Sequence, residues 1–188
     1  MRPPPHNIVP VAVLFELMLG LLGAALARWW DVPLKESLMP EVDPVIRGVA
    51  GATPMLAILV LLTYSNWPPV VDLRRQVESI VEQLFGAARW WELALVAAAA
   101  GLGAESLFRG ALQPIVAGWT TPAIGLVVVS LLFGLLHAAS TAYFFLATSI
   151  GAYLGWMTQQ YDDLVAPIIT HAFYDFVALV WLQRRIEA

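Results

Sequence analysis

The sequence contains no cysteine, which excludes disulfide bonds, thiolate nucleophiles and cysteine-ligated zinc. Charged residues are scarce as well, at 13% of 188 residues, and the formal net charge is -4. Because binding to nucleic acid requires a concentrated basic surface, we expect no nucleic acid partner. The chain also lacks an internal repeat and any hydrophilic stretch long enough for a second domain. The sequence therefore predicts a single domain that comprises residues 1–188.

Apolar residues make up most of the chain. Hydrophobic residues account for 60% of the sequence, compared with about 45–50% in a soluble domain, and the mean hydropathy is +0.73. Long apolar runs of this kind are typical of helices that cross about 30 Å of hydrocarbon. We therefore predict an all-α, polytopic helical bundle in a lipid bilayer, with six transmembrane helices at residues 8–26, 49–64, 93–116, 123–139, 142–157 and 164–182.

Residues 70–89 follow a different pattern. Their apolar side chains fall on one helical face and their charged side chains on the other, which is typical of an amphipathic helix that lies in the membrane interface. Packing of this helix against another subunit is the alternative. The segment divides the membrane domain into two N-terminal spans with a proline-rich loop (8–69), the interfacial helix (70–89) and a core that carries the polar motifs (90–182).

The distribution of arginine and lysine predicts the topology. With six spans, one side of the membrane carries both termini together with Arg2, Arg74, Arg75, Arg89, Arg184 and Arg185, and the other side carries Arg28, Lys35 and Arg47. By the positive-inside rule, both termini are cytoplasmic. We expect an integral membrane protein of a bacterial cytoplasmic membrane.

Polar residues at membrane depth are candidates for a functional site, because an unpaired charge there costs several kcal/mol. Glu105 and Arg109 are four residues apart, as are His171 and Asp175, so each pair lies on one helical face. His137 lies near the end of the fourth predicted span. Helices that bring these groups together would form one polar site.

The residue types leave several roles open. Glu105 and Arg109 form either a structural ion pair or a site in which Glu105 is a general base, although a neighbouring arginine weakens a base. His137 is either a satisfied interior histidine or a group that polarises a carbonyl. Glu105, His137, His171 and Asp175 could together hold a divalent metal, but the metalloprotease spacing is absent and we expect no required cofactor. Glu16 is a further acidic residue within an apolar run.

Three short motifs carry a resemblance to a known family. They are Glu105-Ser-Leu-Phe-Arg109-Gly, Phe133-Gly-Leu-Leu-His137 and His171-Ala-Phe-Tyr-Asp175. In this order, they resemble the motifs of the CAAX-protease and bacteriocin-processing family (CPBP, or Abi), which consists of polytopic intramembrane endopeptidases. The resemblance implies that His137 and His171 stabilise the oxyanion of the attacked carbonyl and that Asp175 supports the site. It also implies that Glu105 is the second glutamate of a Glu-Glu-x-x-x-Arg motif.

The first glutamate of that motif is thought to activate water, and Ala104 stands in its place. An alanine cannot accept a proton. One interpretation is an endopeptidase that hydrolyses a peptide bond of a membrane protein or peptide and uses a different base, for which Asp175 is one candidate. The alternative is a pseudoenzyme that serves as an assembly factor or subunit of a membrane complex. A transporter is less favoured, because the sequence has no paired broken helices or internal repeat.

Overall fold

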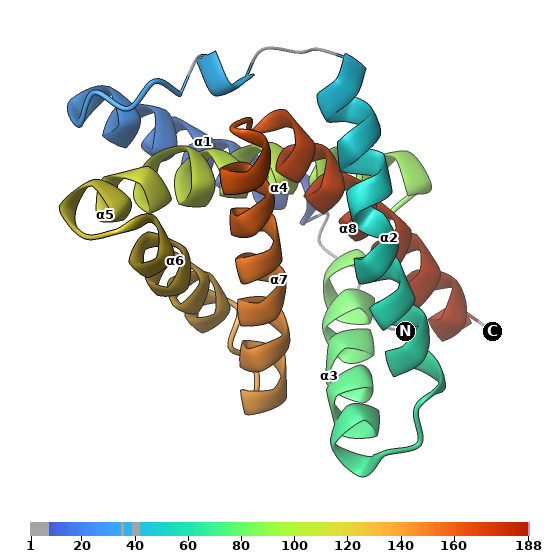
Figure 1. The fold of residues 1–188 in the computed structure, drawn as a ribbon. Helices are drawn as coiled ribbons and strands as arrows, with labels where there is room; N and C mark the ends of the chain where they lie inside the picture. The colour runs from blue at the N-terminus through green and yellow to red at the C-terminus, as the bar shows by residue number, and fades with distance from the viewer. Residues whose placement is uncertain (1–7, 35, 39–41, 188) are drawn as a thin grey trace.

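The structure is a computed structural model that describes residues 8–34, 36–38 and 42–187. All regular secondary structure in these ranges is helical (Figure 1), which confirms the predicted all-α fold class. The elements are α1 (Val9–Trp29), η1 (Glu36–Leu38), α2 (Val42–Tyr64), α3 (Pro68–Phe85), α4 (Trp90–Leu107), the π-helical segment η2 (Phe108–Leu112), α5 (Gln113–Trp119), α6 (Pro122–Leu136), α7 (Thr141–Tyr161) and α8 (Val165–Glu187). Arg2, Lys35 and Pro40, which the topology and loop predictions used, lie outside the described residues.

The helix boundaries follow from local sequence. The side chains of Thr121 and Ser140 accept hydrogen bonds from the backbone N–H groups three residues later and so cap the starts of α6 and α7. Asp162 ends α7 in the left-handed conformation (φ 52°), and Asp163 accepts a hydrogen bond from the backbone of Ala166 at the start of α8. Polar capping residues therefore separate the last three helices at the turns that the sequence predicts.

Among the described residues, four helical segments are long and apolar enough to cross a membrane, which is fewer than the six predicted. They are α1, α2, the continuous stretch Trp90–Trp119 and Val165–Arg185 in α8. Helix α6 is apolar, but at 15 residues it is short. Helix α7 has 21 residues and is not among the four, because polar residues dilute its hydrophobicity: Thr148, Ser149, Thr158, Gln159 and Gln160. The helices exist where the sequence predicts them, but α6 is too short for an independent span and α7 is too polar.

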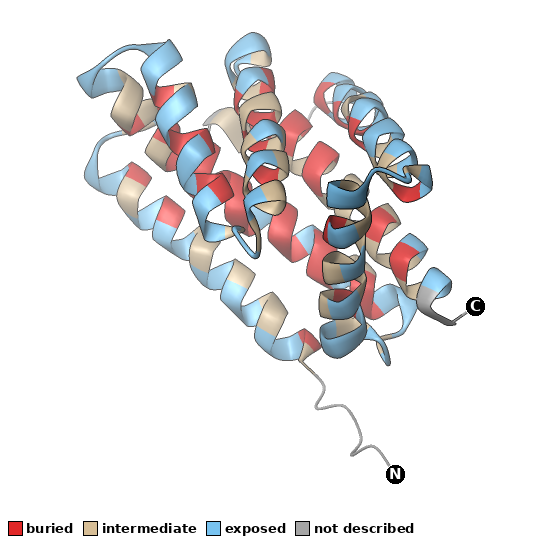
Figure 2. Cartoon of the chain, turned by 90° about the horizontal axis from the view of Figure 1, so that it is seen from below, coloured by how far each residue is buried: buried red, intermediate tan, exposed pale blue. Residues whose placement is uncertain are grey.

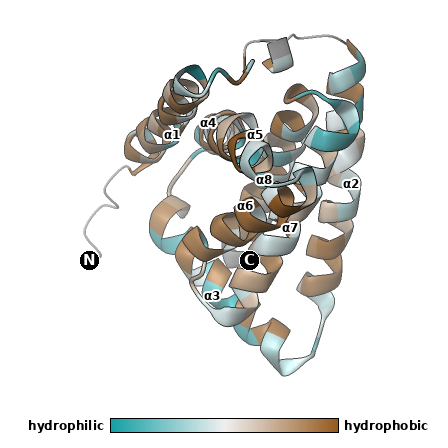
Figure 3. Cartoon of the chain, turned by 60° about the vertical axis from the view of Figure 1, so that its left-hand side comes forward, coloured by the Kyte–Doolittle hydropathy of each residue, from teal (hydrophilic) through white to brown (hydrophobic). Residues whose placement is uncertain are grey.

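The outer surface of the bundle is apolar. Leu21, Leu61, Leu136 and Phe145 are each more than 60% exposed, and hydrophobic colour covers outward sides of α2 and α6 (Figure 3). Buried residues lie on the sides of the helices that face the middle of the molecule (Figure 2). A surface on which large apolar side chains predominate requires lipid rather than water around it. The protein is an integral membrane protein.

Helix α4 is the centre of the packing, with α1 on one side and α8 on another (Figure 1). Two glycines allow this close approach. A Cβ atom at Gly103 would lie 1.9 Å from the backbone oxygen of Glu16 in α1, and one at Gly101 would lie 2.7 Å from the backbone oxygen of Ile168 in α8. Small residues at helix crossings are typical of membrane bundles. The backbones of three helices therefore meet next to Glu105.

Helix α3 is the predicted amphipathic helix, but its apolar face lies against this chain. Leu73 and Val81 are buried, and α3 packs on α8, α2 and α7. Its Arg74 donates hydrogen bonds to the backbone oxygens of Thr63 and Ser65, at 2.5 and 3.3 Å, and so ties α3 to the end of α2. The helix therefore forms a wall of the bundle.

Candidate active site

The site begins at the end of α4, where Glu105 and Arg109 form a buried ion pair. Nη1 of Arg109 lies 3.0 Å from Oε1 of Glu105, and their side chains are 1% and 0% exposed. Arg109 belongs to the π-helical segment η2, in which the backbone N–H of Gln113 donates to the oxygen of Phe108. Such wide turns within α-helices occur frequently at functional sites.

Arg109 and Gln113 attach this helix to α7. Nη2 of Arg109 donates to the backbone oxygen of Gly151 at 2.8 Å, and the amide of Gln113 donates to that of Gly155 at 3.0 Å. Both donors and both acceptors are four residues apart, so the two bonds lie one helical turn from each other. Our sequence analysis did not identify Gln113, although its spacing from Arg109 was a signal that could have pointed to it.

His171 connects the ion pair to Asp175. Its Nδ1 lies 2.7 Å from Oε1 of Glu105, and its Nε2 lies 3.3 Å from Oδ2 of Asp175. The result is a continuous chain of contacts from Arg109 through Glu105 and His171 to Asp175. Both ring nitrogens face carboxylate oxygens, which only accept hydrogen bonds, so both nitrogens of His171 are satisfied when both carry protons. These four side chains together are then electrically neutral, with two cations and two carboxylates.

His137 ends α6 and is held differently. Its Nδ1 lies 2.7 Å from the backbone oxygen of Phe133, and its ring stacks on the Phe133 ring with centroids 4.3 Å apart. Because a carbonyl only accepts, Nδ1 carries the proton, and Nε2 is left for a substrate or water. Nε2 can then stabilise an oxyanion only when the ring is a cation.

Phe133 links the two histidines. Its ring contacts His171 edge-on at 6.1 Å between centroids and Phe108 at 5.2 Å, and the Arg109 guanidinium lies 4.6 Å from its centroid. The phenyl ring, which is 3% exposed, therefore orients both imidazoles and shields the guanidinium.

An apolar cavity of about 420 Å³ opens next to these groups. Residues of α1, α2, α3, α4, α7 and α8 form most of its wall, and the polar groups at its lining include Glu16, His137 and Asp175. Glu105 and His171 are buried behind the wall and are not part of the lining. A mostly apolar cavity with a few converging polar groups is typical of a binding site for a small or extended apolar ligand.

Ala104 lies in an apolar cluster. It is 5% exposed and packs in one cluster with Phe108, Phe133 and Ala147. The methyl group of this alanine can neither hold nor activate water.

No group of three or more histidine, aspartate and glutamate side chains in the described residues is arranged as a metal site. Both nitrogens of His171 and Nδ1 of His137 already have partners, so the four residues proposed as ligands do not converge on one point.

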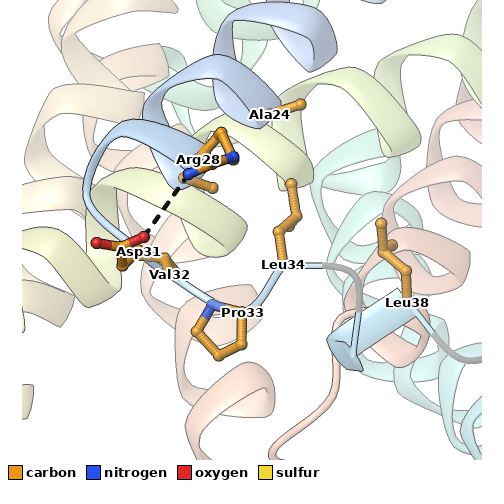
Figure 4. Close-up of a pocket in the computed structure, with 8 residues that line it drawn as sticks. Ala24, Arg28, Asp31, Val32, Pro33, Leu34 and Leu38 are labelled. Carbon is orange, nitrogen blue, oxygen red and sulfur yellow. Dashed lines mark ion pairs between the residues drawn. The ribbon is translucent and has the colours of Figure 1, made fainter.

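A second hollow, of about 470 Å³, lies at the end of α1. Figure 4 shows Arg28 and Asp31 at its edge, with Pro33 and Leu34 from the following loop. The Arg28–Asp31 pair is 3.7 Å apart, and its side chains are 87% and 93% exposed. Exposed charges of this kind are hydrated and support no chemistry like that of the buried side chains from Arg109 to Asp175.

Three comparisons with known proteins bear on this site. Residues 86–177 match the family described as Rce1-like, type II CAAX prenyl endopeptidase. No curated protein and no solved structure gave a match. The matched stretch includes Glu105, Arg109, His137, His171 and Asp175 and leaves out α1 and α2. This match, together with the three motifs within it, confirms over residues 86–177 the resemblance to the CAAX-protease and bacteriocin-processing family.

Proposed function

We propose that this protein hydrolyses a peptide bond of a membrane-associated protein or lipidated peptide that binds in the cavity next to His137 and Asp175. The observation that carries the proposal is the cavity itself. Its apolar walls suit a lipid chain or a hydrophobic peptide, and its polar lining lies next to a buried, charge-balanced chain of residues. The family match supports the same class of reaction.

The residues divide into two groups by their access to the cavity. His137 lines it and would contact the carbonyl oxygen of the substrate through Nε2. His171 is buried behind Asp175, and its two contacts fix the positions of Glu105 and Asp175. In this proposal, His171 stabilises the reaction electrostatically, together with Arg109, Glu105 and Asp175. Among the motif residues, only His137 and Asp175 contact the substrate.

The proposed environment is a bacterial cytoplasmic membrane with both termini in the cytoplasm. The placement of arginines supports this orientation, because Arg74 and Arg75 in α3 and Arg184 and Arg185 in α8 fall on the side of the termini. Substrates would then be processed at the cytoplasmic side.

The test is hydrolysis of internally quenched peptides, with and without a farnesylated cysteine near the C-terminus, by the purified full chain in lipid nanodiscs. We expect turnover by the wild type and a loss of about 10²–10³-fold in His137→Ala, the usual effect of removing one oxyanion donor. Leu136→Ala is the matched control, because Leu136 is the preceding residue and is 67% exposed. Equal turnover by His137→Ala and Leu136→Ala would overturn the proposal.

A second function is favoured by one observation, the alanine at position 104 in an apolar cluster. A family member without a base would serve as a structural or assembly subunit of a membrane complex. Such a subunit would co-purify from mild detergent with partners in fixed ratio, and His137→Ala would leave that ratio unchanged. The same preparation would hydrolyse no peptide.

A further inference from the structure

Glu16 is an unusual residue for the middle of α1. It interrupts an apolar helix, and its Oε2 atom is buried without a hydrogen-bond partner in the described part of the chain. An unpaired carboxylate at membrane depth costs free energy, so its presence points to a functional role. The three family motifs do not include it, and the family match begins only at residue 86.

The structure places Glu16 at the site. It lines the same cavity as His137 and Asp175, and it lies close enough to His171 and Asp175 to interact electrostatically with both. The glycine contact described above sets its height in the membrane, because the backbone of Glu16 touches Gly103, two residues before Glu105. The crossing of α1 and α4 therefore brings a second carboxylate, in addition to Asp175, to the lining of the cavity.

Among the carboxylates near this cavity, Glu16 has the most freedom to accept a proton. Oε1 of Glu105 is shared by Arg109 and His171, and Glu105 is wholly buried behind the cavity wall. Oδ2 of Asp175 is held by His171. A general base needs a free lone pair next to the water that it activates. Glu16 lines the cavity, and its Oε2 has no hydrogen-bond partner to give up in the described residues.

Glu16 also lies near the position where Ala104 provides no carboxylate. Leu19, about one turn further along α1, packs against the cluster that contains Ala104. Ala100, one turn before Ala104 on α4, lines the cavity together with Glu16. The two helices thus form neighbouring walls of one cavity, and α1 supplies it with a carboxylate where α4 contributes only Val96 and Ala100.

We propose that Glu16 is the general base of the hydrolytic reaction, supplied by α1. The Glu16 carboxylate takes a proton from a water molecule as the water oxygen bonds to the peptide carbonyl carbon. The carbonyl electron pair moves to the oxygen, where His137 stabilises it. When that pair returns, the C–N bond breaks and the leaving nitrogen takes the proton from Glu16, so that a carboxylic acid and an amine are released. This inference rests on the proposed function.

The test compares Glu16→Gln with wild type in nanodiscs, with the same quenched farnesylated peptides. Glutamine keeps the size of the side chain and removes the base, so we expect kcat to fall by about 10²–10⁴-fold with KM unchanged. Leu17→Gln is the matched control, because it adds the same amide at the next residue, which is 42% exposed. Glu16→Asp, which keeps a carboxylate, should retain turnover at a reduced kcat.

The pH profile separates Glu16 from Asp175. A general base must be ionised, so kcat/KM of the wild type falls at acidic pH. This acidic limb should disappear in the residual activity of Glu16→Gln and remain in Asp175→Asn. The inference is overturned, and the proposed function retained, if Glu16→Gln keeps wild-type kcat or if only Asp175→Asn loses the limb.

A different variant decides the case in which the wild type hydrolyses none of the peptides. If Ala104→Glu then hydrolyses them, the site is hydrolytic but Glu16 does not serve as its base, and the inference fails alone. If Ala104→Glu is also inactive, the proposed function fails, and the inference fails with it.

Discussion

Replacing Arg109 by methionine tests whether the buried charges of this protein stabilise one another. Methionine occupies a similar volume but removes the charge and all five donors. Glu105 would lose one of its two charge-assisted hydrogen bonds, each of which contributes about 1.5–3 kcal/mol. The oxygen of Gly151 would lose its bond as well. We expect a loss of about 3–5 kcal/mol in the free energy of unfolding, the range for breaking a buried ion pair by removing one partner.

The assay is unfolding in mixed micelles with increasing SDS, followed by the fluorescence of the eight tryptophans. Glu105→Gln and the double variant complete a double-mutant cycle. Because each single variant strands the other charge, the double variant should lose less than the sum of the two single losses. Arg28→Met is the control, since its partner Asp31 and its own side chain are both largely exposed, and we expect no measurable change there. A loss below about 1 kcal/mol in Arg109→Met, or additive losses in the cycle, would refute the reasoning.

Two further substitutions test the packing around the site. In Gly103→Ala, the new methyl group would meet the backbone oxygen of Glu16 at 1.9 Å, so we expect a loss of about 1–3 kcal/mol in thermal or SDS unfolding. Gly118→Ala is the control, because there is open space around Gly118, and we expect it to be neutral or stabilising. An equal change in unfolding stability for both variants would contradict the proposed helix contact. Arg74→Met removes the hydrogen bonds from α3 to the oxygens of Thr63 and Ser65, so we expect faster proteolysis near Asn66, with exposed Arg75→Met as the control. Equal proteolysis rates would show that Arg74 does not hold the two helices together.

Local spacing determined a large part of this protein in advance. Apolar runs predict where the helices lie, because hydrophobic burial depends on neighbours in the chain. The structure adds the capping residues Thr121 and Ser140, which satisfy backbone groups at the starts of α6 and α7. The contacts of Glu105 with Arg109 and of His171 with Asp175 follow from a separation of four residues, which on any helix places two side chains on one face.

Only the tertiary structure decided how these local pairs combine. The bond between His171 and Glu105 joins residues 66 positions apart, and that from Arg109 to Gly151 joins residues 42 apart. Both depend on how α4 crosses α7 and α8, which side-chain packing over the whole bundle sets. The same holds for α3, whose amphipathic pattern shows which face is apolar but not what covers it. Glu16 is a further case. The sequence shows an acidic residue within an apolar run, but only the contact between α1 and Gly103 brings it to the cavity.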